Sequence, residues 1–311
     1  MSDTVLISGG TGLIGKSLTA HLIKKGYEII ILTRKLGLPV QPGVSYANWD
    51  LEKQEIDAKA IQKADYIIHL AGAGVMDKKW TEEYKKEIVE SRTTSSALLY
   101  KGLRENNNTV RAVISSSAIG WYGKDPENFQ KKEGFSETDP SDKGFLGETC
   151  KLWEDSIEPL KKLHIRLVKF RTGIVLSNEG GAFPEFKKSL RFGIAAILGS
   201  GKQVISWIHI DDLCRMFVYA LERVSTQGAY NAVAPFPVSN KKLILNTAKL
   251  LRGSFFIPVH IPEMVLNFMM GKRSIEVLKS TTVDSSKIRE TGFTFLYPTI
   301  DLALKNLCEV E

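Results

Sequence analysis

Val5–Gly15 reads V-L-I-S-G-G-T-G-L-I-G, and this stretch decides the fold of the chain. Its apolar run predicts a buried β-strand, and the amphipathic stretch Lys16–Lys25 that follows predicts a helix. Between them, Gly9, Gly12 and Gly15 recur at every third position. A strand, a tight glycine turn and a helix N-terminus, in that order, offer free backbone N–H groups to a pyrophosphate. The stretch therefore predicts a dinucleotide-binding turn.

The end of the next predicted strand, Glu28–Thr33, indicates which dinucleotide this turn would bind. It lies about 20 residues after the glycines, where NAD sites carry an Asp or Glu for the ribose 2′-hydroxyl. Here the tip reads Thr33-Arg34-Lys35 and has no acid. A carboxylate would repel a 2′-phosphate, whereas a guanidinium can bind it bidentately and stack on adenine. The tip predicts NADP(H), with a solvated basic loop as the alternative.

Length and composition fit one large α/β unit. The 311 residues are 43% hydrophobic and 25% charged, and three dispersed cysteines suggest neither a disulfide framework nor a metal site. The net charge of +7 suits an anionic cofactor, and its lysine pairs are scattered along the sequence, so we expect no nucleic acid partner. No apolar run is long enough for a bilayer and no signal peptide is recognisable, so we expect a cytoplasmic protein without a membrane partner.

Predicted strands and helices alternate through the first half of the chain, a pattern typical of a parallel sheet covered on both faces. From about residue 172 the pattern becomes irregular, with many Gly and Pro residues. We therefore expect a Rossmann doubly wound parallel sheet with a smaller, interleaved C-terminal α/β lobe. The expected division is a nucleotide-binding Rossmann domain over 1–171, to which 203–232 returns, and a substrate-facing lobe with a C-terminal extension over 172–311.

Motifs that follow one another along nearly the whole chain point to one family. They are Ser8–Gly15, His69–Gly72, Trp80-Thr81 with Ser91-Arg92, Ser115–Ala118 with Tyr122-Gly123, Trp153-Glu154, Arg171–Leu176, Ser206–Asp212 and Tyr230–Pro235. With them the chain resembles an extended short-chain dehydrogenase/reductase of the NAD-dependent epimerase/dehydratase superfamily. More narrowly, it resembles the atypical, nucleotide-sugar-epimerase-like branch known as epimerase family proteins. The tail from Glu290 to Pro298 resembles the C-terminal extension of that branch.

The resemblance implies an NADP-binding Rossmann domain and a set of cofactor contacts. The implied contacts are Gly9, Thr11, Gly12, Leu13 and Ile14 at the pyrophosphate, Thr33, Arg34 and Lys35 at the 2′-phosphate, Asp50 and Leu51 at the adenine, Leu70, Ala71 and Gly72 under the adjoining ribose, and Val175 near the nicotinamide. Glu87 and Arg92 match positions that reach the cofactor in this branch. An ordinary surface charge pair is the alternative interpretation of these two residues.

The resemblance leaves the catalytic residues open. Hydride-transferring members of the superfamily use a Ser together with a Tyr-x-x-x-Lys pair, whose ammonium lowers the tyrosine pKa from one helical turn away. Ser117 matches the serine, but Leu146 and Cys150 stand where the Tyr and the Lys would be. The candidate catalytic residues are therefore Ser117 and Tyr122. For Tyr122 the alternative is a packed turn aromatic with its hydroxyl at the surface.

Four other segments have expected structures. We expect helices over 81–105 and near 145–162, whose charged surfaces favour a monomer. In folds that the chain resembles, Trp207–Asp212 is a structural strand-to-helix corner, so we expect an Asp to cap a helix that begins near Leu213. The alternative for His209 and its acids is a general base with its orienting carboxylate. Met264, Phe268, Met269 and Met270 are expected to form an apolar helix face in the C-terminal lobe, in the core or, as the alternative, as the wall of an apolar pocket.

Two functions fit these patterns best. The first is an NADP(H)-binding oxidoreductase or epimerase-like protein that acts on an unidentified small carbonyl or hydroxyl substrate and for which Ser117 and Tyr122 matter. The alternative is a non-catalytic NADP(H)-binding sensor or regulatory protein, which the missing Tyr and Lys favour. A nucleic acid-binding or scaffold protein with a vestigial cofactor fold is a third alternative.

Overall fold

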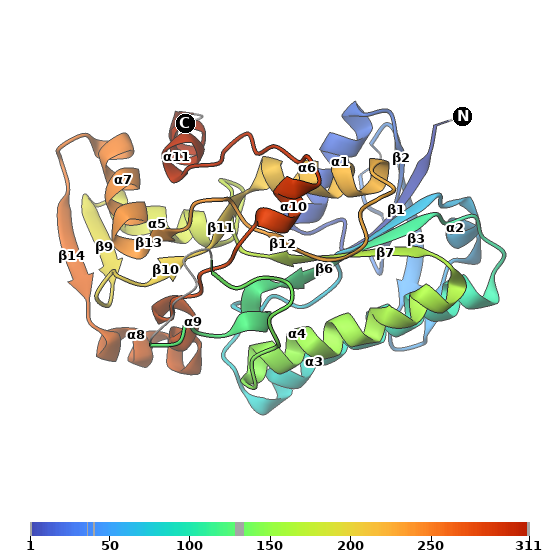
Figure 1. Cartoon of the computed structure of the whole chain (residues 1–311), viewed down its shortest axis with the longest axis horizontal. Helices are drawn as coiled ribbons and strands as arrows, with labels where there is room; N and C mark the ends of the chain where they lie inside the picture. Colours follow the sequence, from blue (N-terminus) through green and yellow to red (C-terminus); the bar gives the residue numbers. More distant parts are fainter. Residues whose placement is uncertain (1, 36, 40, 128–133, 310–311) are drawn as a thin grey trace.

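The computed structural model describes residues 2–35, 37–39, 41–127 and 134–309. Its main feature is a large sheet, which lies toward the right of Figure 1. Within these residues the sheet has eight strands in the order β12-β7-β6-β5-β1-β2-β3-β4. They are β1 (Thr4–Ser8), β2 (Glu28–Thr33), β3 (Val44–Asp50), β4 (Glu55–Ile56), β5 (Tyr66–His69), β6 (Ala112–Ala118), β7 (Arg166–Thr172) and β12 (Gly228–Ala232). Neighbouring strands run parallel except β3 and β4, which are antiparallel. This confirms the predicted doubly wound sheet.

Alternate side chains of β1 enter two different cores, which explains its continuous apolar sequence. Val5 and Ile7 pack with α1 (Leu13–Lys24) and α6 (Ile210–Glu222). Leu6 packs on the other face with α2 (Ala58–Lys63) and α3 (Glu82–Glu105). Figure 1 shows α1 and α6 above the sheet, and α3 and α4 (Phe145–Ile157) below it.

The two helices below the sheet correspond to those predicted over 81–105 and near 145–162. The first is α3, whose N-cap Thr81 accepts a hydrogen bond from the Tyr84 N–H at 3.2 Å. The second is shorter than expected, because α4 ends at Ile157 and continues as a 3₁₀ turn over Glu158–Leu163. Pro159 lies at the start of that turn and has no N–H to continue the α-helical ladder.

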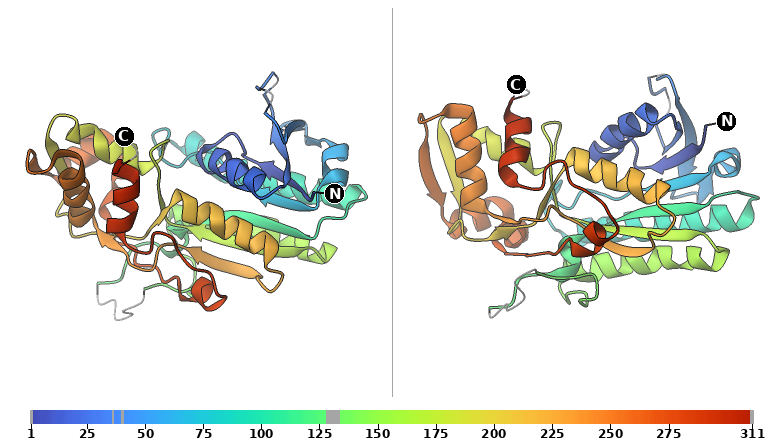
Figure 2. Two further views of the ribbon diagram at one scale, coloured as in Figure 1. Left: turned by 90° about the horizontal axis from the view of Figure 1, so that it is seen from above. Right: turned by 45° about the horizontal axis from the view of Figure 1, so that its top comes forward.

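The remaining elements gather to the left of the sheet in both views of Figure 2. They are β8 (Ile174–Leu176), α5 (Ala182–Leu190), β9 (Ile194–Leu198), β10 (Val204–Ile205), β11 (Trp207–His209), β13 (Val238–Ser239), α7 (Asn240–Arg252), β14 (Ile257–Ile261), α8 (Glu263–Met270), α9 (Ser274–Leu278) and α11 (Ile300–Glu309). In the described residues, two-stranded sheets pair β8 with β11, β10 with β13, and β9 with β14 here. Their core includes Phe183, Trp207 and Leu304.

The chain returns to the large sheet twice after it first leaves at Thr172. It returns first through α6 and β12, which pairs with β7, and then through α10 (Ser286–Glu290), which packs against β12. The last helix, α11, packs on α7 in the smaller part. This path is compatible with the expected return of 203–232, and the domain limits themselves stay a prediction.

Two local expectations are wrong. Helix α6 begins at Ile210 rather than Leu213, and its N-cap is His209, whose Nδ1 accepts from the Asp211 N–H at 3.2 Å. Asp212 does not cap it, because its carboxylate accepts from the N–H groups of Leu296 and Tyr297. The apolar face expected in the core is wrong too, since Met264, Phe268 and Met269 of α8 are 82%, 91% and 65% exposed and Met270 is half-buried. Among the residues that the structure describes, no helix has the length and hydropathy of a membrane span.

Candidate dinucleotide site

The glycine turn after β1 requires glycine for two separate reasons. Gly9 has a positive φ of 72°, and a Cβ on it would lie 2.8 Å from the Leu70 carbonyl carbon. A Cβ on Gly15 would lie 2.5 Å from the Gly10 Cα, so the first turn of α1 can pack here only without a side chain. A hydrogen bond of 3.1 Å from the Gly12 N–H to the Gly9 carbonyl closes the turn.

The N-terminus of α1 has the character of an anion site. Its N-cap Gly12 has no side chain to bond the first N–H groups of the helix. A Cβ on Gly12 would meet one atom within 4 Å, the Gly9 carbonyl oxygen at 3.3 Å. The backbone is therefore open on the side from which a phosphate would approach the helix.

Exposed cations lie at the tip of β2, next in the sheet to β1. The Thr33 hydroxyl accepts from the Lys35 N–H at 3.0 Å, which shapes the tip, and the side chains of Arg34 and Lys35 are exposed. Within the described part of the chain neither cation forms an ion pair. Asp50 ends β3 nearby, and one of its oxygens accepts from the N–H groups of Glu52 and Lys53. The Lys53 N–H is the main reason that the pKa of Asp50 is lowered, and Arg34 adds a smaller effect.

The residues after β5 form a second wall beside the glycine turn. The Leu70 N–H donates to the Ser8 carbonyl at 3.0 Å, and the Leu70 carbonyl lies against Gly9. The Ala73 N–H donates to the Ser91 hydroxyl of α3 at 3.0 Å. The structure thus brings the predicted residues 70–72 next to the predicted pyrophosphate turn, at the carboxyl ends of adjacent strands.

Arg92 and Glu87, both on α3, lie in different surroundings. Arg92 is buried beside Gly72, where an added Cβ would lie 3.1 Å from the Arg92 Cζ. Its guanidinium stacks over Trp153 at 4.8 Å, donates to the Ile88 carbonyl at 2.8 Å, and meets no carboxylate partner among the described residues. Glu87 is at the surface and pairs with Lys78 at 3.0 Å. The surface-pair interpretation therefore describes Glu87 here, but not Arg92.

Ser117 lies at the end of β6 and is bonded inward. Its hydroxyl donates to the Glu154 carboxylate of α4 at 2.9 Å, and both side chains are buried. Arg171 binds the same carboxylate through Nε at 2.7 Å and Nη2 at 3.2 Å, and Lys169 Nζ lies 3.1 Å away. Burial acts to raise the pKa of Glu154, but Arg171 and Lys169 outweigh it, so the pKa lies below its usual value.

Tyr122 belongs to the same buried network. It ends a 3₁₀ turn, Ile119–Tyr122, and its hydroxyl donates to the Asn231 Oδ1 at 2.6 Å and accepts from Arg171 Nη1 at 3.0 Å. Burial raises the pKa of this phenol well above its usual value. The hydroxyl is therefore inside the protein, and not at the surface as the alternative interpretation expected.

On α4, a leucine and a cysteine occupy the positions of the usual catalytic Tyr and Lys. Leu146, Cys150 and Glu154 are four residues apart and all point toward β6 and the turn after it, where a Cβ on Gly120 would lie 3.3 Å from the Leu146 Cβ and 3.5 Å from the Cys150 Sγ. Burial raises the pKa of the Cys150 thiol to about 12, so it stays protonated at neutral pH. Lys151 is exposed and paired with Asp155, and does not stand in for the missing lysine.

Sequence reasoning missed the ionic part of this site. Arg171 and Asn231 lie in two of the quoted motifs, but no spacing rule brings them to Ser117, since β7 and β12 are far from β6 in sequence. The available signal was the placement of charged residues in strands that are otherwise apolar, such as Lys169 and Arg171 in β7. Val175 lies on β8, half-buried, and pairs with Ile208 of β11.

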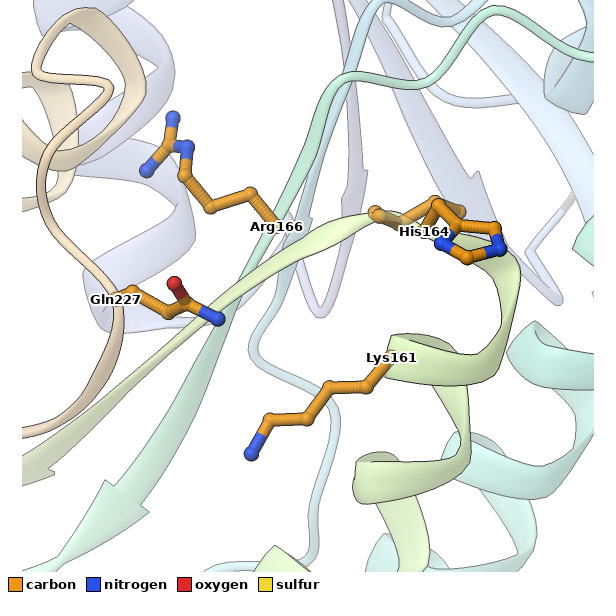
Figure 3. Close-up of a pocket in the computed structure, with 5 residues that line it drawn as sticks. Lys161, His164, Arg166 and Gln227 are labelled. Carbon is orange, nitrogen blue, oxygen red and sulfur yellow. The ribbon is translucent and has the colours of Figure 1, made fainter.

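A separate hollow lies at the opposite end of β7 and does not belong to this site. Lys161, His164, Arg166 and Gln227 line it (Figure 3). The Arg166 guanidinium is engaged in hydrogen bonds to the Ala220 and Leu221 carbonyls at the end of α6. Lys161 pairs with Glu158 at 2.6 Å. No group of three or more His, Cys, Asp or Glu side chains in the described ranges is arranged to hold a metal ion.

Comparison with known sequences agrees with this geometry. A family model described as the NAD dependent epimerase/dehydratase family matches residues 5–144, and a domain of unknown function (DUF1731) matches residues 261–307. The chain is 34% identical over 302 residues to an epimerase family protein of Staphylococcus aureus, covering 97% of this chain and 98% of that protein. It is also 34% identical over 304 residues to one from Staphylococcus saprophyticus, with coverage of 97% and 98%.

Solved structures give the same result. Human epimerase family protein SDR39U1 (isoform 2), crystallised with NADPH, matches with a TM-score of 0.84 and 28% identity over 98% of this chain and 99% of that one. A nucleoside-diphosphate sugar epimerase from Corynebacterium glutamicum matches with a TM-score of 0.77 and 30% identity, over 100% of this chain and 59% of that one.

Fold, glycine turn and relatives together define an atypical short-chain dehydrogenase/reductase, as the motifs indicated. The chain belongs to the NAD-dependent epimerase/dehydratase family and carries the DUF1731 domain at its C-terminal end.

Proposed function

We propose that this protein binds NADP(H) in the site between the glycine turn and the tip of β2. The proposal is based on two exposed cations, Arg34 and Lys35, which form no ion pair with the residues that the structure describes. They lie near the N-terminus of α1, which no side chain from the same residues caps. The uncapped N–H groups suit the pyrophosphate, and the cations suit the 2′-phosphate. The relative SDR39U1, which was crystallised with NADPH, supports this choice over NAD.

Arg92 would hold the other half of the cofactor. Hydride-transferring relatives place a lysine where Cys150 stands, and its ammonium orients the nicotinamide ribose. In this chain Arg92 is the buried cation next to Cys150, and it influences the pKa of that thiol. It also lies beside Gly72, which is expected under the ribose next to the adenine, so Arg92 borders the cofactor path between the two riboses. We assign to Arg92, on α3, the positive charge that α4 no longer supplies.

The proposed reaction is a hydride transfer with a small carbonyl or hydroxyl compound. A bound NADPH would give the hydride and water the proton as a carbonyl becomes a hydroxyl, and in the reverse direction NADP would take the hydride and water the proton. Ser117 is the first catalytic candidate, because its proton is directed at Glu154 and its oxygen is left to accept from a substrate hydroxyl. Tyr122 can take part only if its hydroxyl leaves Asn231 and Arg171.

The test follows the reduced-nicotinamide absorbance of the NADPH-loaded protein while fractions of a metabolite extract are added. Loss of the signal in one fraction, and its persistence with the Ser117→Ala variant, would support the reaction and lead to the substrate. A signal that stays constant in every fraction at saturating NADPH would contradict it. NADPH binding is measured separately by fluorescence, so that a failure to bind is not mistaken for a failure to react.

A non-catalytic NADP(H) sensor is the second candidate, and one observation favours it. Both hydroxyls near the expected nicotinamide, those of Ser117 and Tyr122, are bonded inside the protein. Leu146 has no acidic group, and burial makes the Cys150 thiol a weaker acid by raising its pKa to about 12. Such a protein would bind NADPH tightly without consuming it. A cytoplasmic location and a monomeric state stay predictions for either function.

A further inference from the structure

The smaller part of the molecule leaves apolar side chains uncovered on its outer side. Figure 1 and the right view of Figure 2 show β14 at the side farthest from the large sheet, with α8 at the end of that strand. The exposed side chains are those of Phe192, Phe255, Ile257, Met264, Phe268 and Met269, and we refer to them together as the apolar edge.

The open sheet face explains the first half of this edge. Strands β9 and β14 pair in parallel, with Ile194 opposite Ile257. The alternate residues Ala195 and Ile197 are buried with α7 on the inner face. Ile257 therefore points outward, and no element in the described part of the chain covers it, because it is 69% exposed.

Helix α8 forms the second half. Leu266 is the buried residue of this helix, whereas Met264 and Phe268, one turn apart, are 82% and 91% exposed. Helices that are apolar all round are ordinarily buried. An exposed patch of this kind on a water-soluble surface marks an interaction site.

The charge around the apolar edge selects the kind of partner. Residues 182–202 and 239–279 together contain eleven Lys and Arg but three Asp and Glu. The rest of the chain contains 31 Lys and Arg and 32 Asp and Glu, so the excess positive charge lies in the part that carries the edge. These lysines are scattered in the sequence, and it is the fold that gathers them.

Individual cations lie at both ends of the edge. Arg191 directly follows α5 and precedes Phe192, and Arg252 donates to the Leu190 carbonyl at 2.9 Å, so both lie beside that phenylalanine. At the other end, Lys272 is exposed directly after α8. A second copy of the chain would bring these like charges together, whereas an anionic surface would neutralise them.

We propose that the apolar edge docks on an anionic lipid surface. The side chains of α8 and β14 would enter the boundary between headgroups and acyl chains, and the surrounding Lys and Arg would meet the acidic headgroups. The three phenylalanines of the edge suit acyl chains as well as bases, but Ile257, Met264 and Met269 offer no ring for base stacking, and this favours lipid over nucleic acid. This revises the expectation of no membrane partner, and it needs no spanning helix.

The test is co-sedimentation of the full chain with vesicles of phosphatidylcholine alone or mixed with phosphatidylglycerol. We expect binding to the mixed vesicles, weakened by salt. The double variant Phe255→Ser, Phe268→Ser should bind them at least about tenfold more weakly, and Arg191→Glu with Lys272→Glu about tenfold more weakly. Val224→Ser is the matched control, because Val224 is 82% exposed, close to the 87% of Phe255 and the 91% of Phe268, but lies after α6. All of these variants should keep their NADPH affinity.

Three results would overturn the proposal. One is the absence of binding to mixed vesicles at low salt. The second is binding that the two phenylalanine changes leave intact, which would make it a purely electrostatic contact, as a nucleic acid would also give. The third is a dimer in sedimentation velocity that the phenylalanine changes abolish while vesicles are not bound, since the edge would then be an interface between copies of the chain.

Discussion

Arg34 concentrates the proposed choice between NADPH and NADH on one exposed side chain. It lies at the tip of β2 without an ion pair among the described residues, so its guanidinium is free to bind a phosphate. Arg34 makes only a small contribution to the lowered pKa of Asp50, which is mainly due to a hydrogen bond from the Lys53 N–H. The preference should therefore depend on Arg34 far more than on the glycine turn, which both dinucleotides share.

We expect Arg34→Ala to weaken NADPH binding by about 30- to 150-fold, the loss of one charged bidentate contact, and to leave NADH binding nearly unchanged. Fluorescence titrations of the protein with NADPH and with NADH measure the two affinities. Lys16→Ala, which removes an exposed cation from α1, is the control. Equal affinity of the unchanged protein for NADPH and NADH would sink the assignment of Arg34.

His69 is a second residue with a measurable consequence. It ends β5 fully buried, with Nδ1 2.6 Å from the Ser8 hydroxyl and Nε2 3.3 Å from the hydroxyls of Ser95 and Ser96. Burial lowers its pKa to about 4. The unfolded chain takes up a proton near pH 6.5, which the folded protein does not, so stability falls as pH falls between these values.

Unfolding in urea at about pH 7.5 and about pH 5 should show a loss of about 2 kcal/mol due to His69. The His69→Gln variant should lack this part of the pH dependence. Exposed His164, changed to Asn, should retain it. If the free energy of unfolding of His69→Gln still fell between about pH 7.5 and about pH 5 as in the unchanged protein, His69 would not be the group responsible.

At the scale of elements, Glu154 holds α4 against the sheet. It joins Ser117 of β6 to Lys169 and Arg171 of β7 within one buried network. Removing one partner of such a pair leaves the others charged and buried, which costs more than the pair itself contributes.

Glu154→Gln should therefore lower the free energy of unfolding by about 3–5 kcal/mol. Ser117→Ala, which removes one hydroxyl, should lower it by about 1 kcal/mol. Urea unfolding at neutral pH compares the two variants. Equal effects would show that the ionic contacts of Glu154 contribute nothing beyond its bond to Ser117.

The elements of the large sheet were predictable from the sequence, whereas the interior of the site was not. The apolar runs at Val5–Ile7 and Ile29–Leu32 predict parallel strands because both faces are covered. The cap of α6 was misassigned to an Asp, because its acid Asp212 binds N–H groups 84 and 85 residues away in the chain. The exposure of α8 was missed for a related reason, since an apolar pattern states what a side chain prefers and not whether anything covers it.

At the scale of the whole molecule, the large sheet and the smaller part should unfold together. Arg215 and the N–H groups of Leu296 and Tyr297 meet on Asp212, which ties α6 to the C-terminal segment. A ligand that binds at the glycine turn should therefore stabilise the whole chain.

At a concentration of NADPH about 100 times its Kd, the free energy of unfolding should rise by about 2.7 kcal/mol. Tryptophan fluorescence reports this in two variants that each keep one of the five tryptophans, Trp49 in β3 or Trp207 in the smaller part, with the others changed to Phe. Coincident transitions at both places are expected. A transition of the smaller part that ignores NADPH would show that the two parts unfold separately.

The two returns of the chain to the large sheet also bear on how such a protein can acquire new specificity. Because α6, β12 and α10 are threaded between segments of the smaller part, no single cut releases that part as a cassette for exchange with another protein. Recombination is thus a poor route to a new ligand for this architecture. Change has to come by point substitution within a shared scaffold, which is one way in which a catalytic helix can lose its Tyr and Lys while the turn that holds the nucleotide is kept.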